Sequence, residues 1–395
     1  MSMRRGWALL CAAALLGVRD AQAQAAQALK LKPADAKLDE EFTLIGSVRE
    51  LSDGRVLITD PRENRVVVAD LKAGTVTPVG RTGSGPNEYG MAGPLHALAA
   101  DSSILFDLSS RRWLLFSGAS IVQTLPPDTP IILAMKGSAR GADAKGNVWT
   151  FASPTQFDQD HAKPGTTETG AADSGFVVRG NRTTAKLDTV ARVRQALSRQ
   201  TVVLNAAGRV QSVSFARAPL AVGEEAVLFP DGWFAVARLD LYRVDWISPD
   251  GRTTKGRPLP VPPIKVTSAE RDAYFARVRS ANPSSAPSKL PASLRSDLDA
   301  LRDQFPAFIP PFVSFGLIAG GDGNLWLLRQ VSMTFPNARY DVVDRRGVLL
   351  GVVSLETSER IVSVGSKTVY VAWKDADDIE RLRRHPSPLA PIKAP

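Results

Sequence analysis

The feature that most constrains the fold is a repeated unit of two short apolar strands introduced by an Asp/Gly turn. The best-preserved copy covers residues 53–60 and 64–68, and a looser copy covers 101–107 and 111–116. Self-similarity at a period of about 40–50 residues is typical of β-propellers, in which each repeat forms one four-stranded blade. The repeat therefore predicts blades arranged around a central tunnel.

Further turns of the same kind follow along the chain. Counting them gives six turn positions, at Gly54, Ser102, Gly146, Gly232, Gly323 and Lys367. Most intervals are about 45 residues long, whereas the two that flank Gly232 are roughly twice that length and must hold additional segments. We therefore predict an all-β fold, a six-bladed β-propeller.

The strands support this architecture because their apolar residues are consecutive rather than alternating. Residues 56–58, 66–68 and 325–328 are uninterrupted apolar runs. Such runs are expected where a sheet is covered on both faces, as each propeller blade is by its two neighbours.

The two long intervals predict different insertions. In the first, residues 176–179 and 186–194 predict the displaced outer strands of blade three, and a further hairpin is expected at 201–204 and 210–215. The second contains the capping-box pair Thr267 and Glu270, which predicts the start of a helix. A second helix is predicted from apolar residues at helical spacing, namely Leu294, Leu298, Leu301 and Phe305. An α-helical hairpin is thus expected at about 265–310, between blades four and five.

The N-terminus has the pattern of a secretory signal peptide. Arg4 and Arg5 precede a short apolar run at 8–18, and the small residues of the 21–23 segment fit a cleavage site. We predict a signal peptide at 1–23, the propeller at 24–384, and a Pro-rich tail at 385–395. A periplasmic or secreted protein without stable membrane insertion is expected. Because the tail is a poor strand, residues 29–32 are predicted to complete blade six.

Charge and cysteine content limit the possible partners. The formal net charge is +9, but the basic residues are dispersed, and together with export this argues against a nucleic-acid partner. The single cysteine, Cys11, lies within the predicted signal peptide. The mature chain would therefore have no disulfide and no cysteine-based metal site.

The motifs of the first blade resemble those of the NHL-repeat and related six-bladed propeller proteins of bacteria. The resemblance rests on Asp-Gly-x-Val-x-Ile-x-Asp at 53–60, Asn-Arg-Val at 64–66 and Gly-x-Gly-Pro-x-Glu-Tyr at 83–89. It implies the fold and an exported protein. It implies no particular activity, because propellers host unrelated functions.

Two features that suggest chemistry are better explained as structural. Asp60 and Asp107 end equivalent strands, where the resemblance implies that each caps backbone amides. The 83–86 glycine-rich loop lacks the Lys-Ser/Thr of a phosphate-binding loop and is expected to be an inter-blade turn. With three histidines in the chain a multi-histidine metal site is not expected, and no metal ligands are assigned.

The candidate ligand-binding residues lie on the predicted innermost strands, which line the tunnel. Arg49, His96 and Arg140 occupy comparable positions in blades one to three, whereas blades four to six have apolar residues there. One half of the tunnel would then be cationic, which suits an amphiphilic anion. In the alternative, these side chains point between blades or pair with Glu50, Glu224 or Glu225.

The function expected from these features is that of a monomeric, non-catalytic binding or interaction module with no cofactor. Its partner would be an anionic small molecule or a cell-envelope protein. The alternative is a lactonase-like hydrolase or a lyase that uses a divalent cation such as Ca²⁺ in the tunnel. A purely structural protein is a third possibility. Catalytic residues are not identified.

Overall fold

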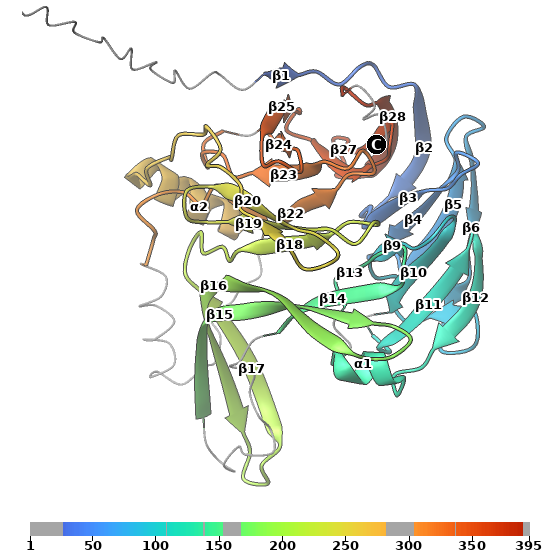
Figure 1. The fold of residues 1–395 in the computed structure, drawn as a ribbon, viewed down its shortest axis with the longest axis horizontal. Coiled ribbons are helices and arrows are strands. Elements are labelled where there is room, and N and C mark those ends of the chain that lie inside the picture. Colours follow the sequence, from blue (N-terminus) through green and yellow to red (C-terminus); the bar gives the residue numbers. More distant parts are fainter. Residues whose placement is uncertain are drawn as a thin grey trace, which may run out of the picture.

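A computed structural model of the chain shows six β-sheets arranged as blades around a common centre (Figure 1). It describes residues 27–107, 109–136, 139–152, 167–281, 304–335 and 337–389, without the side chains of 167–173, 197–201, 203, 210–216 and 281. The predicted six-bladed propeller is confirmed. The predicted signal peptide and most of the second predicted helix lie outside the described residues.

The first three blades follow one another along the chain. Blade one consists of β3 (Ser47–Glu50), β4 (Val56–Asp60), β5 (Arg65–Asp70) and β6 (Thr75–Pro78). Blade two consists of β9 (Leu95–Ala97), β10 (Ser102–Asp107), β11 (Arg112–Ser117) and β12 (Ser120–Leu125). Blade three consists of β13 (Gly141–Ala142), β14 (Asn147–Ala152), β15 (Thr167–Asn181), β16 (Leu187–Leu204) and β17 (Val210–Arg217).

The other three blades complete the ring. Blade four consists of β18 (Glu225–Leu228), β19 (Phe234–Arg238), β20 (Arg243–Ile247) and β21 (Thr253–Thr254). Blade five consists of β22 (Phe312–Ala319), β23 (Leu325–Arg329), β24 (Arg339–Val343), β25 (Leu349–Ser354) and β1 (Ala28–Leu29). Blade six consists of β26 (Glu359–Val364), β27 (Thr368–Lys374), β28 (Glu380–Pro386) and β2 (Ala36–Phe42).

Apolar side chains are buried at each of the six junctions between neighbouring blades. Every residue of β4 is buried, as its uninterrupted apolar run predicts. One hydrophobic cluster lies at each junction, and the largest buried side chains include Trp113, Trp246 and Trp326. Since burial contributes about 25 cal/mol per Å² of apolar surface, these inter-blade clusters are the main source of stability in a chain without disulfides.

Ring closure differs from the sequence prediction. β2 completes blade six by pairing antiparallel with β28, with Ala36 opposite Arg384 and Phe42 opposite Glu380. The segment at 29–32, which was predicted to close the ring, does not belong to blade six. It overlaps β1, the outermost strand of blade five, which pairs in parallel with β25. Leu38 and Phe42 of β2 are both buried, and this fixes which segment closes the ring. In addition, β28 extends through His385 to Pro386, so blade six includes the start of the predicted tail.

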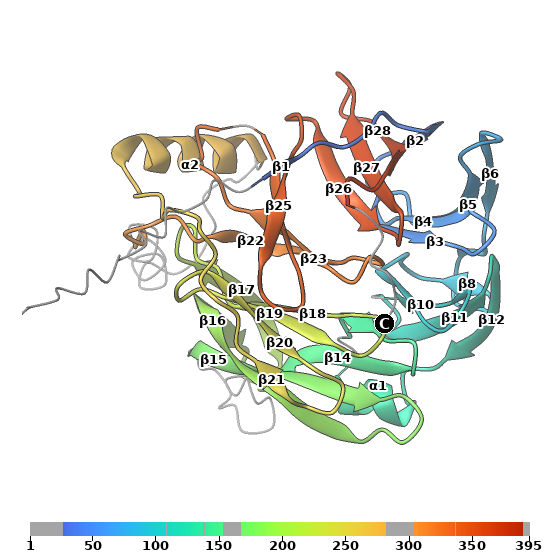
Figure 2. The same ribbon diagram turned by 45° about the horizontal axis from the view of Figure 1, so that its top comes forward.

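The insertions lie at the outside of the ring. The helix α2 (Ser268–Ala281) is at the periphery, beside blade five (Figure 2). Its Glu270 is buried and accepts a hydrogen bond from the Met333 amide, while Tyr274 and Phe275 contact Phe305. The two predicted hairpins of blade three form one long strand pair, β15 with β16, and a third strand, β17, that projects from the ring (Figure 1).

Three short elements complete the description. The helix α1 (Pro130–Ala134) packs with Ile131 and Ile132 against the junction of blades two and three. The strands β7 (Arg81–Thr82) and β8 (Glu88–Tyr89) form a small parallel pair within the loop from blade one to blade two.

Candidate functional site

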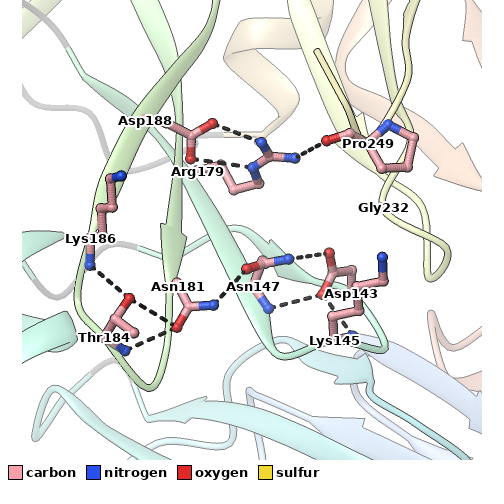
Figure 3. A pocket seen from close by; sticks show the side chains of 10 residues that line it. All are labelled: Asp143, Lys145, Asn147, Arg179, Asn181, Thr184, Lys186, Asp188, Gly232 and Pro249. Carbon is pink, nitrogen blue, oxygen red and sulfur yellow. Dashed lines mark hydrogen bonds and ion pairs between the residues drawn. The ribbon is translucent and has the colours of Figure 1, made fainter.

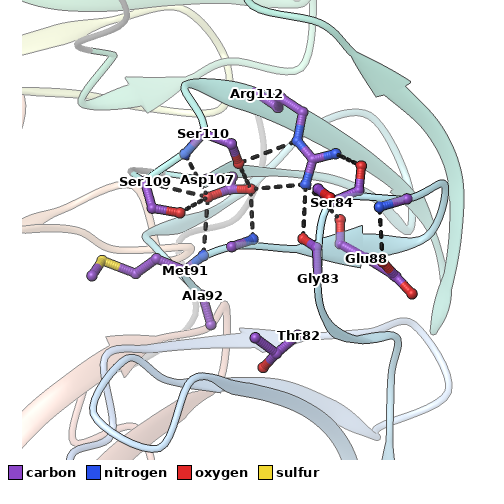
Figure 4. Close-up of polar contacts among 12 residues, drawn as sticks. Thr82, Gly83, Ser84, Glu88, Met91, Ala92, Asp107, Ser109, Ser110 and Arg112 are labelled. Carbon is purple, nitrogen blue, oxygen red and sulfur yellow. Dashed lines mark hydrogen bonds and ion pairs between the residues drawn. The ribbon is translucent and has the colours of Figure 1, made fainter.

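Asp60 and Asp107, the last residues of β4 and β10, organise the backbone segments that lead into their blades. Oδ2 of Asp60 accepts hydrogen bonds from the amides of Thr43 and Leu44, which lead into the innermost strand of the same blade. Asp107 does the same for the amides of Gly90 and Met91 (Figure 4). The predicted structural role of both carboxylates is therefore confirmed.

The glycine-rich loop at 83–86 is also structural. The guanidinium of Arg112 donates hydrogen bonds to the carbonyl oxygens of Ser84, at 2.6 Å, and of Gly83, at 3.2 Å (Figure 4). A phosphate-binding loop instead directs several amides at its ligand. The amide of Gly85 is already bound to the carboxylate of Glu88. The prediction of an inter-blade turn is confirmed.

The six innermost strands line the tunnel as predicted, since β3, β9, β13, β18, β22 and β26 each contact the next around the ring. The three candidate residues lie on or beside these strands, but no hydrogen bond, ion pair or ring contact in the described part of the chain joins one to another. Arg49 lies at the end of β3 that leads to the Asp/Gly turn. Its guanidinium donates to the carbonyl oxygens of Glu50 and Ala100, so it is tied to two backbone turns.

His96 points toward the junction of blades two and three. Its ring lies 5.2 Å from the ring of Phe106, and Nε2 is buried without a hydrogen-bond partner among the described residues. Desolvation lowers the pKa of His96 to about 4. The side chain is therefore neutral near pH 7 and adds no positive charge to the tunnel.

Arg140 is in a different environment, at the end of the tunnel where the innermost strands begin. It immediately precedes β13, and its amide donates to the carbonyl oxygen of Trp149. Its guanidinium lies between two aromatic rings, 4.7 Å from the centroid of Phe151 and 4.9 Å from that of Phe315. Phe151 belongs to blade three and Phe315 to blade five, so the guanidinium joins residues of two blades that are not neighbours.

Phe315 is not among the residues predicted from the sequence, and it has an unusual conformation. It lies in an irregular part of β22, where the register with β23 shifts between Phe312 and Leu317. Its φ is 60°, which is rare for a bulky residue, and the side chain is 69% exposed. The next residue must be glycine, because a Cβ on Gly316 would lie 2.8 Å from the Cβ of Leu328. The bulge thus holds an aromatic ring at the tunnel mouth.

Two further charged groups are close to Arg140. Glu225, at the start of β18, is buried, and desolvation raises its pKa even though the charge of Arg140 opposes this effect. Desolvation also lowers the pKa of Arg140, while Glu225 opposes this change and Arg217 adds to it. We call Arg140, Phe151, Arg217, Glu225 and Phe315 the mouth cluster.

The described residues contain no group of three His, Cys, Asp or Glu side chains placed to hold a metal ion. The hydrolase or lyase alternative calls for three or more carboxylate or amide ligands that converge at one tunnel mouth, and it remains a prediction. No helix in the described part of the chain is long and apolar enough to cross a membrane.

Comparisons with known proteins give structural likeness but no family. No family model and no curated protein matches the sequence. A protein from Bacteroides fragilis, designated a possible exported protein, is 11% identical over 90% of this chain and 93% of its own, with a TM-score of 0.43.

Two other solved structures show likeness of similar extent. Virginiamycin B lyase from Staphylococcus aureus is 10% identical over 89% of this chain and 97% of its own, with a TM-score of 0.38. The calcium-binding protein regucalcin from Agrobacterium tumefaciens is 11% identical over 92% and 97%, with a TM-score of 0.36. The propeller assignment itself rests on the strand pairing of this chain.

Proposed function

We propose that the protein is an exported, non-catalytic binding module whose mouth cluster takes an amphiphilic anion. The observation that carries this proposal is the guanidinium of Arg140 between two phenylalanine rings, one of them exposed and in a strained conformation. A bulky residue at positive φ costs about 1–3 kcal/mol, and such strain is concentrated at functional sites.

The geometry suits an anion because the guanidinium lies against two rings while its N–H donors are not used. The ring centroids lie 4.7 and 4.9 Å from its central carbon, and the side chain has no hydrogen bond or ion pair with another described residue. The edge of a guanidinium carries N–H donors that bind a carboxylate in a bidentate manner. Stacking on the two rings also limits the motion of the long side chain, so less entropy is lost when a ligand binds.

Charge and hydrophobicity indicate which ligands fit. Arg140 and Arg217 carry two positive charges against the one that Glu225 carries when ionised, which favours a monoanion. The exposed ring of Phe315 offers an apolar surface next to the cation. An alkyl or aryl carboxylate matches both features, since its charged end would meet Arg140 and its apolar part Phe315.

The test is the binding of octanoate to the mature chain, measured by isothermal titration calorimetry. Octanamide serves as a neutral probe of the same length, and acetate as an anion without the apolar part. We expect octanoate to bind more tightly than either. Arg140→Gln should weaken octanoate binding at least tenfold, and Phe315→Ala should weaken it severalfold, because charge-assisted hydrogen bonds are stronger than one apolar contact.

Exposed residues of the same two types, elsewhere in the chain, serve as matched controls. Arg209, in the turn between β16 and β17, is an exposed arginine, and Phe308 is 51% exposed. Arg209→Gln and Phe308→Ala should leave the octanoate affinity unchanged. The proposal is wrong if octanamide binds as well as octanoate, or if Arg140→Gln binds octanoate like the unsubstituted protein.

A further inference from the structure

A concave site, separate from the mouth cluster, lies at the other end of blade three, on the face that carries the turns between the first and second strands of each blade. The cavity has a volume of about 380 Å³ and lies at the junction with blade four (Figure 3). The 143–147 and 181–186 turns of blade three line it on one side, and Gly232 and Pro249 of blade four on the other. Its volume is within the range of about 300–1,000 Å³ found for small-molecule sites.

Both acidic groups of this cavity already have partners. The carboxylate of Asp143 accepts hydrogen bonds from the amides of Lys145 and Asn147 and from the side-chain amide of Asn147. Asp188 pairs with Arg179 through Nε, at 3.3 Å, and Nη2, at 2.8 Å. The same guanidinium donates to the carbonyl oxygen of Pro249 and so joins the two blades.

The basic side chains, in contrast, are in excess. Lys145 and Lys186 line the cavity, and neither ammonium group has an acidic partner among the described residues. The guanidinium of Arg182 packs beside Gly146, with Nε 3.3 Å from the position that a Cβ there would take. Three cations, Lys145, Lys186 and Arg182, therefore lie in or beside the cavity. Of the two carboxylates in its lining, Asp188 forms an ion pair with Arg179 and Asp143 has none among the described residues.

A neighbouring junction on the same face is bridged by oppositely charged side chains. Between blades four and five, Arg345 of the blade-five turn pairs with Asp231 at 2.6 Å and lies over the ring of Trp233. At the cavity, two turns of blade four present Gly232 and Pro249, and neither residue is charged. Blade four thus contributes no charged side chain to the lining that holds Lys145 and Lys186.

We infer that this cavity binds a compact polyanion, a small polar molecule with two or more negative charges, such as a phosphate monoester or a dicarboxylate. Two ammonium groups supply the complementary charge, and ammonium groups bind phosphate as point charges. Asn147, Asn181 and Thr184 make the rest of the lining polar. This site differs in chemistry from the mouth cluster, which has exposed aromatic surface, and it does not depend on the function proposed above.

The experiment measures binding of inorganic phosphate and of malonate to the mature chain by isothermal titration calorimetry at low ionic strength. The two probes distinguish a phosphate from a dicarboxylate as the preferred anion, and acetate tests the need for more than one charge. We expect at least one of the first two to bind at least tenfold more tightly than acetate. The double substitution Lys145→Gln with Lys186→Gln should lower that affinity at least tenfold.

Two further variants identify the cause of any loss. Lys145→Arg with Lys186→Arg keeps the charges and should retain most of the binding. Lys72→Gln removes an exposed lysine from a turn of blade one and should have no effect. Octanoate binding should persist in the double glutamine variant, which separates this site from the mouth cluster. The inference is overturned if neither phosphate nor malonate binds better than acetate, or if the glutamine variant binds both like the unsubstituted protein.

Discussion

Substituting Asp107 with asparagine should destabilise the protein in a way that depends on pH. The Asp107 side chain is almost fully buried, at 1% exposure, and accepts hydrogen bonds from the amides of Gly90 and Met91 and from the hydroxyl of Ser110. Burial alone would raise its pKa, but these hydrogen bonds outweigh burial and lower the pKa to about 2. Asparagine keeps the shape of the side chain and removes the charge.

The magnitude follows from the pKa. Relative to an ordinary value of 3.8, a pKa of about 2 corresponds to about 2 kcal/mol of stability at neutral pH. Because the pKa is lowered in the folded state, this contribution is fully present above pH 4 and is lost as the pH falls from about 4 to 2. Asparagine also turns an amide NH₂ toward backbone donors, so we expect a total loss of about 2–4 kcal/mol at pH 7.

The assay is urea denaturation followed by tryptophan fluorescence at pH 7, 4 and 3. The difference in free energy of unfolding between the two proteins should shrink by about 1 kcal/mol between pH 7 and pH 3. Asp128→Asn is the matched control, because Asp128 is exposed, and it should change stability by less than about 0.5 kcal/mol. A difference that stays constant over this pH range would refute the argument.

Two further predictions concern ring closure and the tunnel. Phe42→Ala should cost about 3–5 kcal/mol of unfolding free energy, because Phe42 is buried and holds β2 on blade six, whereas Phe335→Ala, at a 36% exposed position, should cost much less. Equal losses in urea denaturation would contradict this closure. His96 should titrate near pH 4 in a proton NMR experiment, since desolvation lowers its pKa. A midpoint at pH 6 or above would mean that its ring is solvated.

Much of the fold could be predicted from the sequence because each blade repeats the same physical requirement. A turn between two strands buried on both faces needs Asp or Gly at the turn and apolar residues beside it. The pattern is explicit in blade one, at Asp53 and Gly54, and is recognisable in four of the other blades. The closing strand was misplaced because β1 and β2 are both short segments near the N-terminus. Their tertiary environment distinguishes them, because Leu38 and Phe42 of β2 are buried and β2 pairs with β28, whereas β1 pairs with β25.

The site was less predictable because it depends on contacts between distant parts of the chain. Arg140 was identified from its position at a predicted innermost strand, and the structure places it immediately before β13. Its partners Phe315 and Glu225 come from blades five and four; Glu225 was one of three acidic partners considered from the sequence, whereas Phe315 was not considered. A possible signal for Phe315 is the glycine that follows it, since a glycine within a strand often marks a bulge. The direction of the His96 side chain could not be inferred from sequence position.

A crystal structure of the mature chain with octanoate would test the proposed function most directly. We expect the carboxylate to lie within hydrogen-bond distance, about 2.7–2.9 Å, of the guanidinium of Arg140, with the alkyl chain against the ring of Phe315. Octanoate bound elsewhere, with the mouth cluster unoccupied at saturating ligand, would contradict the assignment of this site.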